Sequence, residues 1–280
     1  MGQSVEGHLA DYMGKEIECD IPPVIAIPTT AGTGSEVTKF IVITDEATDV
    51  KMLLKGDCLI PKIAIIDPAF TVDMPKSVTA ATGLDAFTHA IEAYTSRKAF
   101  GLTDSLAASA IKRIFKYLPV AYKNGYDTKA REEMAIAATE AGICINNSSV
   151  TLVHGMSRPI GALFHVPHGL SNAMLLSECM KFAVDGAYEK FGALAREVQV
   201  ADLSDSDEVA ANKLIAAIDD LCAACEVPTL SKYGIDEEKF MSSLTKMASD
   251  AVASGSPGNT IKEVTADDCI EIYKRVYSYK

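Results

Sequence analysis

The sequence predicts a small α/β segment followed by a large all-α domain, and two observations carry that prediction. Short β-branched runs alternate with turns over residues 20–73, whereas apolar residues recur with helical spacing from Pro75 to the end. Three strands with almost no helices between them cannot cover both faces of a parallel sheet. We therefore expect an incomplete α/β unit over residues 1–74, whose missing part is absent or supplied by another chain, and a helical domain over residues 75–280.

The strands of the first unit are expected at three runs of strand length. VIAI at 24–27, FIVIT at 40–44 and IAIID at 63–67 are rich in β-branched residues and are bounded by Pro, Gly and Asp. The stretch between the second and third runs is basic and polar, and we expect no strand there.

The helices of the second unit follow from apolar periodicity and from start signals. Asp236 and Thr265 each precede an apolar run, where a side-chain oxygen can accept a hydrogen bond from an amide of the first turn. The expected ranges are 77–81, 84–95, 104–122, 129–146, a Gly-containing stretch around 150–164, 171–182, 185–197, 207–226, 237–253 and 265–277.

Composition excludes several classes of partner. Lys and Arg number 26 against 38 Asp and Glu, and the resulting charge of -12 repels nucleic acid and anionic membranes. No apolar run reaches the length of a transmembrane helix, and the N-terminus lacks the pattern of a signal peptide. The seven cysteines form no disulfide framework. We expect a cytoplasmic protein with no nucleic-acid or membrane partner.

One cysteine pair has two interpretations. Cys222-Ala-Ala-Cys225 has the spacing of a redox or zinc motif, but it lies inside an apolar helical run with no second pair. The interpretation that we favour is the core face of a helix.

Histidines and one aspartate suggest a metal site. Asp85 and His89 are four residues apart on an expected helix, so they project from one face. His154 begins a segment punctuated by Gly and Pro, and His168 lies in a Pro-His-Gly turn. A carboxylate with imidazoles suits iron(II), zinc or manganese. Singly, each residue also fits a capping pair or a hydrogen-bonded core histidine, whereas their joint occurrence predicts one divalent ion.

A loop rich in glycine and threonine follows the first expected strand. PTTAGTGSE at 28–36 can bring backbone amides and hydroxyls close to a phosphate or ribose. The spacing alone is equally typical of a plain turn, because it matches neither established phosphate-binding pattern.

Four motifs taken together resemble the iron-containing (group III) alcohol dehydrogenase family. PTTAGTGSEVT, MPKSVTAATGLDAFTHAIEAY, HGMSRPIGALFHVPHGLSNAML and ASGSPGN occur in the family's order from about Asp11 onward. The resemblance implies an incomplete Rossmann-like dinucleotide-binding domain at 1–74 and a helical metal-binding catalytic domain at 75–280, a dehydroquinate synthase-like architecture. It implies the metal ligands Asp85, His89, His154 and His168, with Fe²⁺ favoured over Zn²⁺.

The resemblance also implies a cofactor, NAD or NADP, a small alcohol or aldehyde as substrate, and a homodimer or higher oligomer. The residues expected against the cofactor share one loop and its neighbourhood: Thr29, Thr30, Gly32, Thr33, Lys51, Phe70 and Thr71.

The sequence departs from the family pattern at two places. Many relatives carry a second histidine where this chain has Arg158, so proton exchange falls to His165, solvent or the cofactor ribose. Arg158 then has two interpretations: it binds a substrate carboxylate or cofactor phosphate, which would favour a hydroxy acid, or it pairs with one of the many carboxylates. The Gly-Gly-Gly-Ser turn that cradles the cofactor pyrophosphate in relatives does not occur.

These departures leave three functions open. The expected function is hydride transfer between a small alcohol or aldehyde and NAD(P). The alternatives are a related metal-dependent synthase or lyase, and a non-catalytic metal-binding remnant.

Overall fold

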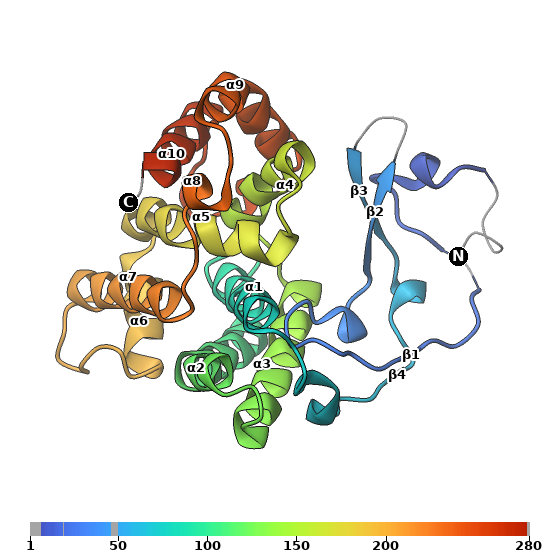
Figure 1. Ribbon diagram of the computed structural model, residues 1–280, viewed down its shortest axis with the longest axis horizontal. Helices are drawn as coiled ribbons and strands as arrows, with labels where there is room; N and C mark the ends of the chain where they lie inside the picture. The colour runs from blue at the N-terminus through green and yellow to red at the C-terminus, as the bar shows by residue number, and fades with distance from the viewer. Residues whose placement is uncertain (1–6, 19, 46–49, 279–280) are drawn as a thin grey trace.

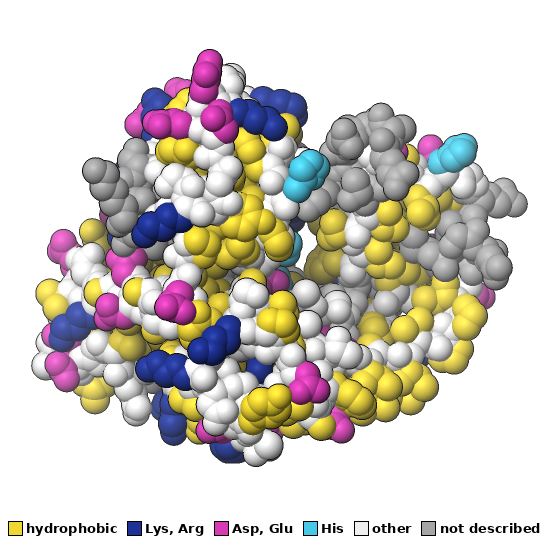
Figure 2. All heavy atoms as spheres, in the orientation of Figure 1, with side chains coloured by type: hydrophobic (Ala, Val, Ile, Leu, Met, Phe, Trp, Pro, Cys, Tyr) yellow, Lys and Arg dark blue, Asp and Glu magenta, His cyan; other side chains and the backbone are white. Residues whose placement is uncertain are grey.

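The computed structural model describes residues 7–18, 20–45 and 50–278 and has two visibly different parts (Figure 1). A thin segment of short strands lies beside a thick body of helices. A hollow separates much of this segment from the helical body, and histidine side chains lie along its helical wall (Figure 2). The fold class therefore agrees with the prediction of a small α/β segment followed by an all-α domain.

The N-terminal segment contains two separate two-stranded sheets. Strand β1 (Ile25–Ala26) pairs in parallel with β4 (Ile63–Ala64), and β2 (Phe40–Asp45) pairs antiparallel with β3 (Val50–Lys55). Four 3₁₀ turns accompany these strands: η1 (Leu9–Tyr12) precedes β1, η2 (Ser35–Val37) and η3 (Asp57–Leu59) lie between strands, and η4 (Pro68–Thr71) follows β4.

The expectation of no strand between the second and third runs was wrong, because β3 occupies that stretch. Its signal is an alternation within VKMLLK: Met52 and Leu54 are buried, whereas Leu53 between them is 37% exposed. The flanking lysines masked this period of two. Leu54 joins Ile17 and Leu59 in a small core of its own, separate from the helical core.

The parallel pair leaves apolar side chains in solvent. Ile25 is 57% exposed, Ile63 52% and Ile65 46%, although strands of a parallel sheet are normally buried on both faces. The expected incompleteness of the sheet is thus visible among the described residues, and Figure 2 shows hydrophobic side chains along this part of the surface.

Ten α-helices, with two short 3₁₀ turns among them, form the body of the described chain after residue 75. They are α1 (Lys76–Tyr94), α2 (Gly101–Lys123), α3 (Thr128–Asn147), α4 (Leu152–Phe164), α5 (His168–Ala183), η5 (Val184–Gly186), α6 (Tyr188–Glu197), α7 (Asp207–Ala224), α8 (Leu230–Tyr233), α9 (Glu237–Ala253), η6 (Pro257–Asn259) and α10 (Ala266–Ser278). None of these helices, within the described residues, is long and apolar enough to cross a membrane.

Helix α1 lies at the centre of this body and packs against α2, α3 and α5. It is one helix where the sequence suggested two, because Gly83 does not interrupt it. A Cβ on Gly83 would lie 2.4 Å from Leu118 Cδ1 on α2. The glycine therefore allows two helices to approach closely, and the remaining backbone hydrogen bonds of α1 outweigh its poor helix propensity.

Candidate metal centre

Helix α1 presents Asp85 and His89 from one buried face. The two residues are 2% and 5% exposed, and the Oδ1 atom of Asp85 lies 3.9 Å from Nε2 of His89. A carboxylate and an imidazole held one helical turn apart in an apolar core require a partner, because burying such groups unsatisfied costs free energy.

Two further imidazoles reach the same oxygen. His154, in the first turn of α4, and His168, the first residue of α5, each place Nε2 at 3.8 Å from Asp85 Oδ1. The ligand atoms of Asp85, His89 and His154 all lie within 4.8 Å of one another. Metal–ligand bonds of about 2.1 Å let two ligands stand up to about 4.2 Å apart. Each distance from Asp85 Oδ1 to an imidazole nitrogen, 3.8 or 3.9 Å, therefore fits a cation shared by the two groups. The side chain of His168 is 44% exposed, so the group opens to solvent on that side.

Glu92 sets the orientation of His154. This glutamate is fully buried on α1, where its Oε1 accepts hydrogen bonds from Thr151 Oγ1 at 2.8 Å and from the Val153 amide at 2.6 Å. Its Oε2 lies 2.5 Å from His154 Nδ1. A carboxylate that accepts the Nδ1 proton leaves the Nε2 lone pair free, which is the usual way in which proteins hold a metal-binding histidine.

Asn172 supports the same tautomer from the other side of the ring. Its Nδ2 donates to Asp85 Oδ1 at 2.7 Å, and the opposite amide orientation would set two acceptors against each other. The same Nδ2 lies 3.1 Å from His154 Nε2 and 3.3 Å from His168 Nε2. An amide nitrogen only donates and has two hydrogens, so beside Asp85 it can donate to one of these two rings. We assign the second hydrogen to His154, the nearer ring, whose Nε2 then carries a lone pair.

The electrostatics favour the protonation states that a cation needs. Burial would raise the pKa of Asp85, but His89, His168, His154 and the Asn172 hydrogen bond outweigh it and hold this pKa below its usual value. Burial lowers the pKa of His154 well below its usual value, which keeps the ring neutral.

Glu92 differs from Asp85 in the balance of these effects. Burial raises the pKa of Glu92 above its usual value and outweighs the donors from Thr151 and Val153, which lower it. With three donors converging on its two oxygens, this side chain acts as an acceptor, and we assign it as the carboxylate.

The donor set fits a divalent cation. One carboxylate and three imidazoles are ligands typical of iron(II) and zinc. His89 Nδ1 is buried with no hydrogen-bond partner among the described residues. This orphaned ring nitrogen shows that the protein alone does not satisfy the buried His89 side chain.

The expected cofactor loop packs against the same helix. A Cβ on Gly32 would lie 2.5 Å from Thr82 Cβ of α1, so this glycine lets the loop approach the helix one turn before Asp85. Thr29 and Thr33 are exposed, and Thr30 is partly exposed. The loop therefore presents hydroxyls beside the helix that carries Asp85.

The remaining expected cofactor residues differ in how exposed their side chains are. Phe70 is 54% exposed, whereas Thr71 is buried and donates from Oγ1 to the Pro68 carbonyl at 2.8 Å. Lys51 lies on β3, and its side chain is outside the part of the structure that is described.

His165 and Arg158 lie at different points of α4. His165 follows the last residue of the helix in a left-handed conformation, with a φ of 55°, and is exposed. Arg158 is partly buried one turn after His154, and its Nη1 donates to Ser256 Oγ at 3.0 Å.

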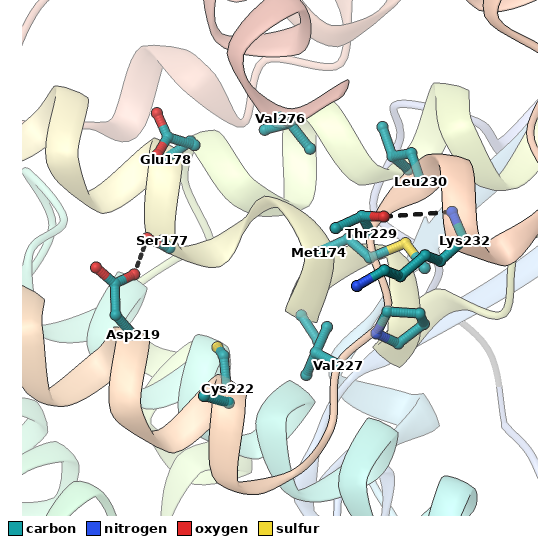
Figure 3. Close-up of a pocket in the computed structure, with 13 residues that line it drawn as sticks. Met174, Ser177, Glu178, Asp219, Cys222, Val227, Thr229, Leu230, Lys232 and Val276 are labelled. Atoms are coloured by element: carbon teal, nitrogen blue, oxygen red, sulfur yellow. Dashed lines mark hydrogen bonds between the residues drawn. The ribbon is translucent and has the colours of Figure 1, made fainter. Parts of the chain in front are cut away.

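A cavity of about 190 Å³ lies away from these residues, between α5, α7 and α8 (Figure 3). Ser177 donates to Asp219 there, and Lys181 pairs with both Asp219 and Glu178. Its two carboxylates, Asp219 and Glu178, thus already have partners. Cys222 also lines it as a free thiol of α7, and burial raises the pKa of this thiol to about 12, as expected of a helix face and not of a redox site.

Two models of known families match the chain. The model described as "Fe-containing alcohol dehydrogenase family, C-terminal" matches residues 79–277, and "Iron-containing alcohol dehydrogenase" matches residues 2–68. This chain belongs to the iron-containing alcohol dehydrogenase family. The resemblance read from the four sequence motifs is therefore confirmed.

Members of the iron-containing alcohol dehydrogenase family align with nearly all of the chain. An NADPH-dependent butanol dehydrogenase of Clostridium saccharobutylicum is 35% identical over 90% of this chain and 64% of its own length. The structure of a 1,3-propanediol oxidoreductase superimposes with a TM-score of 0.93 at 34% identity, over 98% of this chain and 72% of that one.

A sulfoacetaldehyde reductase of Bifidobacterium kashiwanohense, solved with NAD⁺, gives a TM-score of 0.86 at 30% identity, over 99% of this chain and 71% of that one. The chain thus spans 64% to 72% of the length of these three family members.

Sequence reasoning missed Glu92 and Asn172. Both had a usable signal: Glu92 follows His89 by three residues in an otherwise apolar stretch, and Asn172 follows His168 by four. These spacings place each polar residue on the ligand face of its helix.

Proposed function

We propose that this chain is a metal-dependent alcohol dehydrogenase that transfers a hydride between a small alcohol or aldehyde and NAD or NADP. The observation that carries the proposal is the convergence of three imidazoles within 3.9 Å of the single oxygen Asp85 Oδ1. Asp85, His89, His154 and His168 are the proposed ligands, with Fe²⁺ as the expected ion and Zn²⁺ as the alternative.

A divalent cation held there supplies Lewis-acid polarisation of a substrate oxygen. The chain's own residues provide the setting: Asp85 supplies the negative charge, and Glu92 and Asn172 hold the His154 ring in the required tautomer. The exposed edge of His168 leaves one side of the group accessible to a small molecule. His165, exposed at the end of α4, is the proposed group for proton exchange with solvent.

The proposed cofactor site is the loop that packs on α1. Thr29, Thr30, Gly32 and Thr33 would lie against the cofactor, with Lys51, Phe70 and Thr71 nearby. The relatives support either dinucleotide, since one is named for NADPH and another was solved with NAD⁺. A homodimer or higher oligomer and a cytoplasmic location belong to the same proposal. The described cysteines of the helical body are free thiols, which supports a reducing compartment.

Elemental analysis and cofactor titration of the purified chain test this proposal together. We expect one divalent ion per chain, its loss in an Asp85→Ala, His154→Ala double variant, and binding of NADH or NADPH. His8→Ala is the matched control, because His8 is an exposed histidine on the N-terminal segment. Metal that survives in the double variant would refute the ligand assignment.

A second candidate function is a non-catalytic metal-binding protein. The exposure of Ile25 and Ile63 favours it, because a sheet of two open strands offers little surface to a dinucleotide. Metal retention without NADH or NADPH binding would support this candidate, and aldehyde reduction by the chain would exclude it.

A further inference from the structure

Arg158 is a partly buried cation with few hydrogen-bond partners within the described structure. Its single hydrogen bond within the described structure runs from Nη1 to Ser256 Oγ at 3.0 Å. Other arginines of the helical body are better satisfied: Arg113 pairs with carboxylates, and the fully buried Arg131 donates to a hydroxyl and two backbone carbonyls. A guanidinium carries five N–H donors, so most of those of Arg158 remain available.

The nearby acid does not neutralise Arg158. Glu92 is close enough to influence the pKa of the arginine, which burial lowers and this glutamate raises. No carboxylate of the described residues lies within ion-pair distance of Arg158, however, and the oxygens of Glu92 already accept from Thr151, Val153 and His154. The interpretation of Arg158 as one half of an ordinary ion pair is therefore not what the structure contains.

Arg158 lies on the same face of α4 as the ligand His154. The two residues are four apart in a continuous helix, so their side chains leave it about one turn, or about 6 Å, apart along the axis. His154 is also influenced electrostatically by Arg158, which lowers its pKa. A molecule whose oxygen reaches the metal centre through the opening at His168 would thus extend toward a cation with free donors.

We propose that Arg158 forms an anion subsite beside the metal centre, and that the substrates are small alcohols or aldehydes carrying a carboxylate or a similar oxyanion two or three carbons from the reacting carbon. This inference rests on the proposed function, because it takes the substrate oxygen to lie at the ion. The fork of the guanidinium matches two oxygens of one such group at once, which a lysine at this position would not do.

Co²⁺-loaded protein provides a readout that does not depend on turnover. The visible absorption of Co²⁺ changes when an oxygen ligand arrives, so it reports binding of 3-hydroxypropionate and of 1,3-propanediol, a neutral molecule with the same carbon skeleton. We expect the acid to bind more tightly than the diol. Arg158→Gln should weaken the acid about 10- to 100-fold, the usual worth of a hydrogen-bonded charge pair, and leave the diol within about threefold.

Two matched variants complete the design. Arg275→Gln removes the same charge from a half-exposed site on α10 and should leave both affinities unchanged. Arg158→Lys keeps the charge but not the fork, and should recover only part of the affinity for the acid. Thermal denaturation of each variant shows that the fold is retained.

The outcomes separate this inference from the function on which it rests. Wild-type protein that takes up no Co²⁺ would refute both. Co²⁺ uptake with equal affinity for acid and diol, or with Arg158→Gln indistinguishable from wild type, would refute the anion subsite alone. Loss of NADH or NADPH binding in Arg158→Gln, with the acid unaffected, would assign the arginine to a cofactor phosphate and overturn the inference.

Discussion

Replacing Glu92 with glutamine tests the metal centre through a residue that is not itself a ligand. Two donors, Thr151 Oγ1 and the Val153 amide, point at Oε1 of this side chain. In Glu92→Gln the amide oxygen keeps those donors, so the NH₂ group faces His154 Nδ1 and can only donate to it. The imidazole must then accept at Nδ1 and carry its proton on Nε2. That proton occupies the position in which a cation is expected.

The size of the effect follows from the lost orientation of one ligand. Removing such an outer partner typically costs about 10- to 100-fold in metal affinity. At a metal concentration about 100 times the wild-type Kd, stabilisation by the metal should fall from about 2.7 kcal/mol to between about 0.4 and 1.4 kcal/mol. Competition against a chelator measures the affinity, and the metal-induced shift in Tm measures the stabilisation.

Glu140→Gln is the control for this experiment. Glu140 is a partly buried glutamate of α3 that accepts from Ser109 at 2.9 Å and has no contact with the ligand group. It should lose some stability with and without metal alike, whereas Glu92→Gln should lose mainly the part that the metal adds. A folded Glu92→Gln protein whose metal affinity stays within about twofold of wild type would refute the assigned tautomer of His154.

Three further predictions concern other parts of the chain. Arg131→Ala should lower the free energy of unfolding by about 3 kcal/mol, because the Thr79 hydroxyl and two carbonyls lose a buried charged donor. A free energy of unfolding within about 0.5 kcal/mol of wild type, measured by urea denaturation, would contradict this. The hydrogen bond to Glu226 raises the pKa of Tyr122 to about 12. The contribution of this hydrogen bond to the free energy of unfolding should therefore be complete below about pH 10, the usual pKa of tyrosine, and decline as the pH rises toward 12. Denaturation across that range should show the decline in wild type and less of it in Tyr122→Phe. His165→Asn should keep the left-handed end of α4 and the metal content but slow aldehyde reduction by about 100-fold or more, and an unchanged rate would remove this histidine from the mechanism.

The fold was predictable to the extent that periodicity reports it. Helices with clear apolar spacing and start signals appear close to their expected ranges; the range 237–253 coincides with α9 and begins after Asp236, whose side chain accepts from the Lys239 amide. The prediction failed at a glycine whose role depends on a contact between two helices. Gly83 was taken as a break, but its role is the close contact between α1 and α2. No local rule reports that contact.

The candidate site was also predictable only where its residues share one helix. Asp85 and His89 could be paired from their spacing, because one helix fixes their relation. The distances from Asp85 to His154 and His168 depend on how α4 and α5 pack on α1. Their joint occurrence in a chain with few histidines suggested one site, and the family resemblance implied the same four ligands. Glu92 and Asn172 were missed because their partners lie on other helices: Glu92 binds the first turn of α4, and Asn172 crosses from α5 to α1.

The proposed metal ligands lie in the helical domain and the proposed cofactor loop in the N-terminal segment, so metal binding and cofactor binding can be tested separately. Asp85, His89, His154 and His168 all lie on α1, α4 and α5, and these helices share one hydrophobic core that includes no strand residue. Glu92, the residue that orients one ligand, belongs to the same helices. Metal binding should therefore tolerate disturbance of the strands, since no proposed ligand and none of the residues that hydrogen-bond to Asp85 or His154 lies on a strand. The loop at 28–36 reaches α1 only through close contacts such as that of Gly32 with Thr82, and a substitution of Gly32 by alanine would push the loop from the helix. Such a variant should keep its metal and lose affinity for NAD(P)H, which separates the two halves of the proposed reaction.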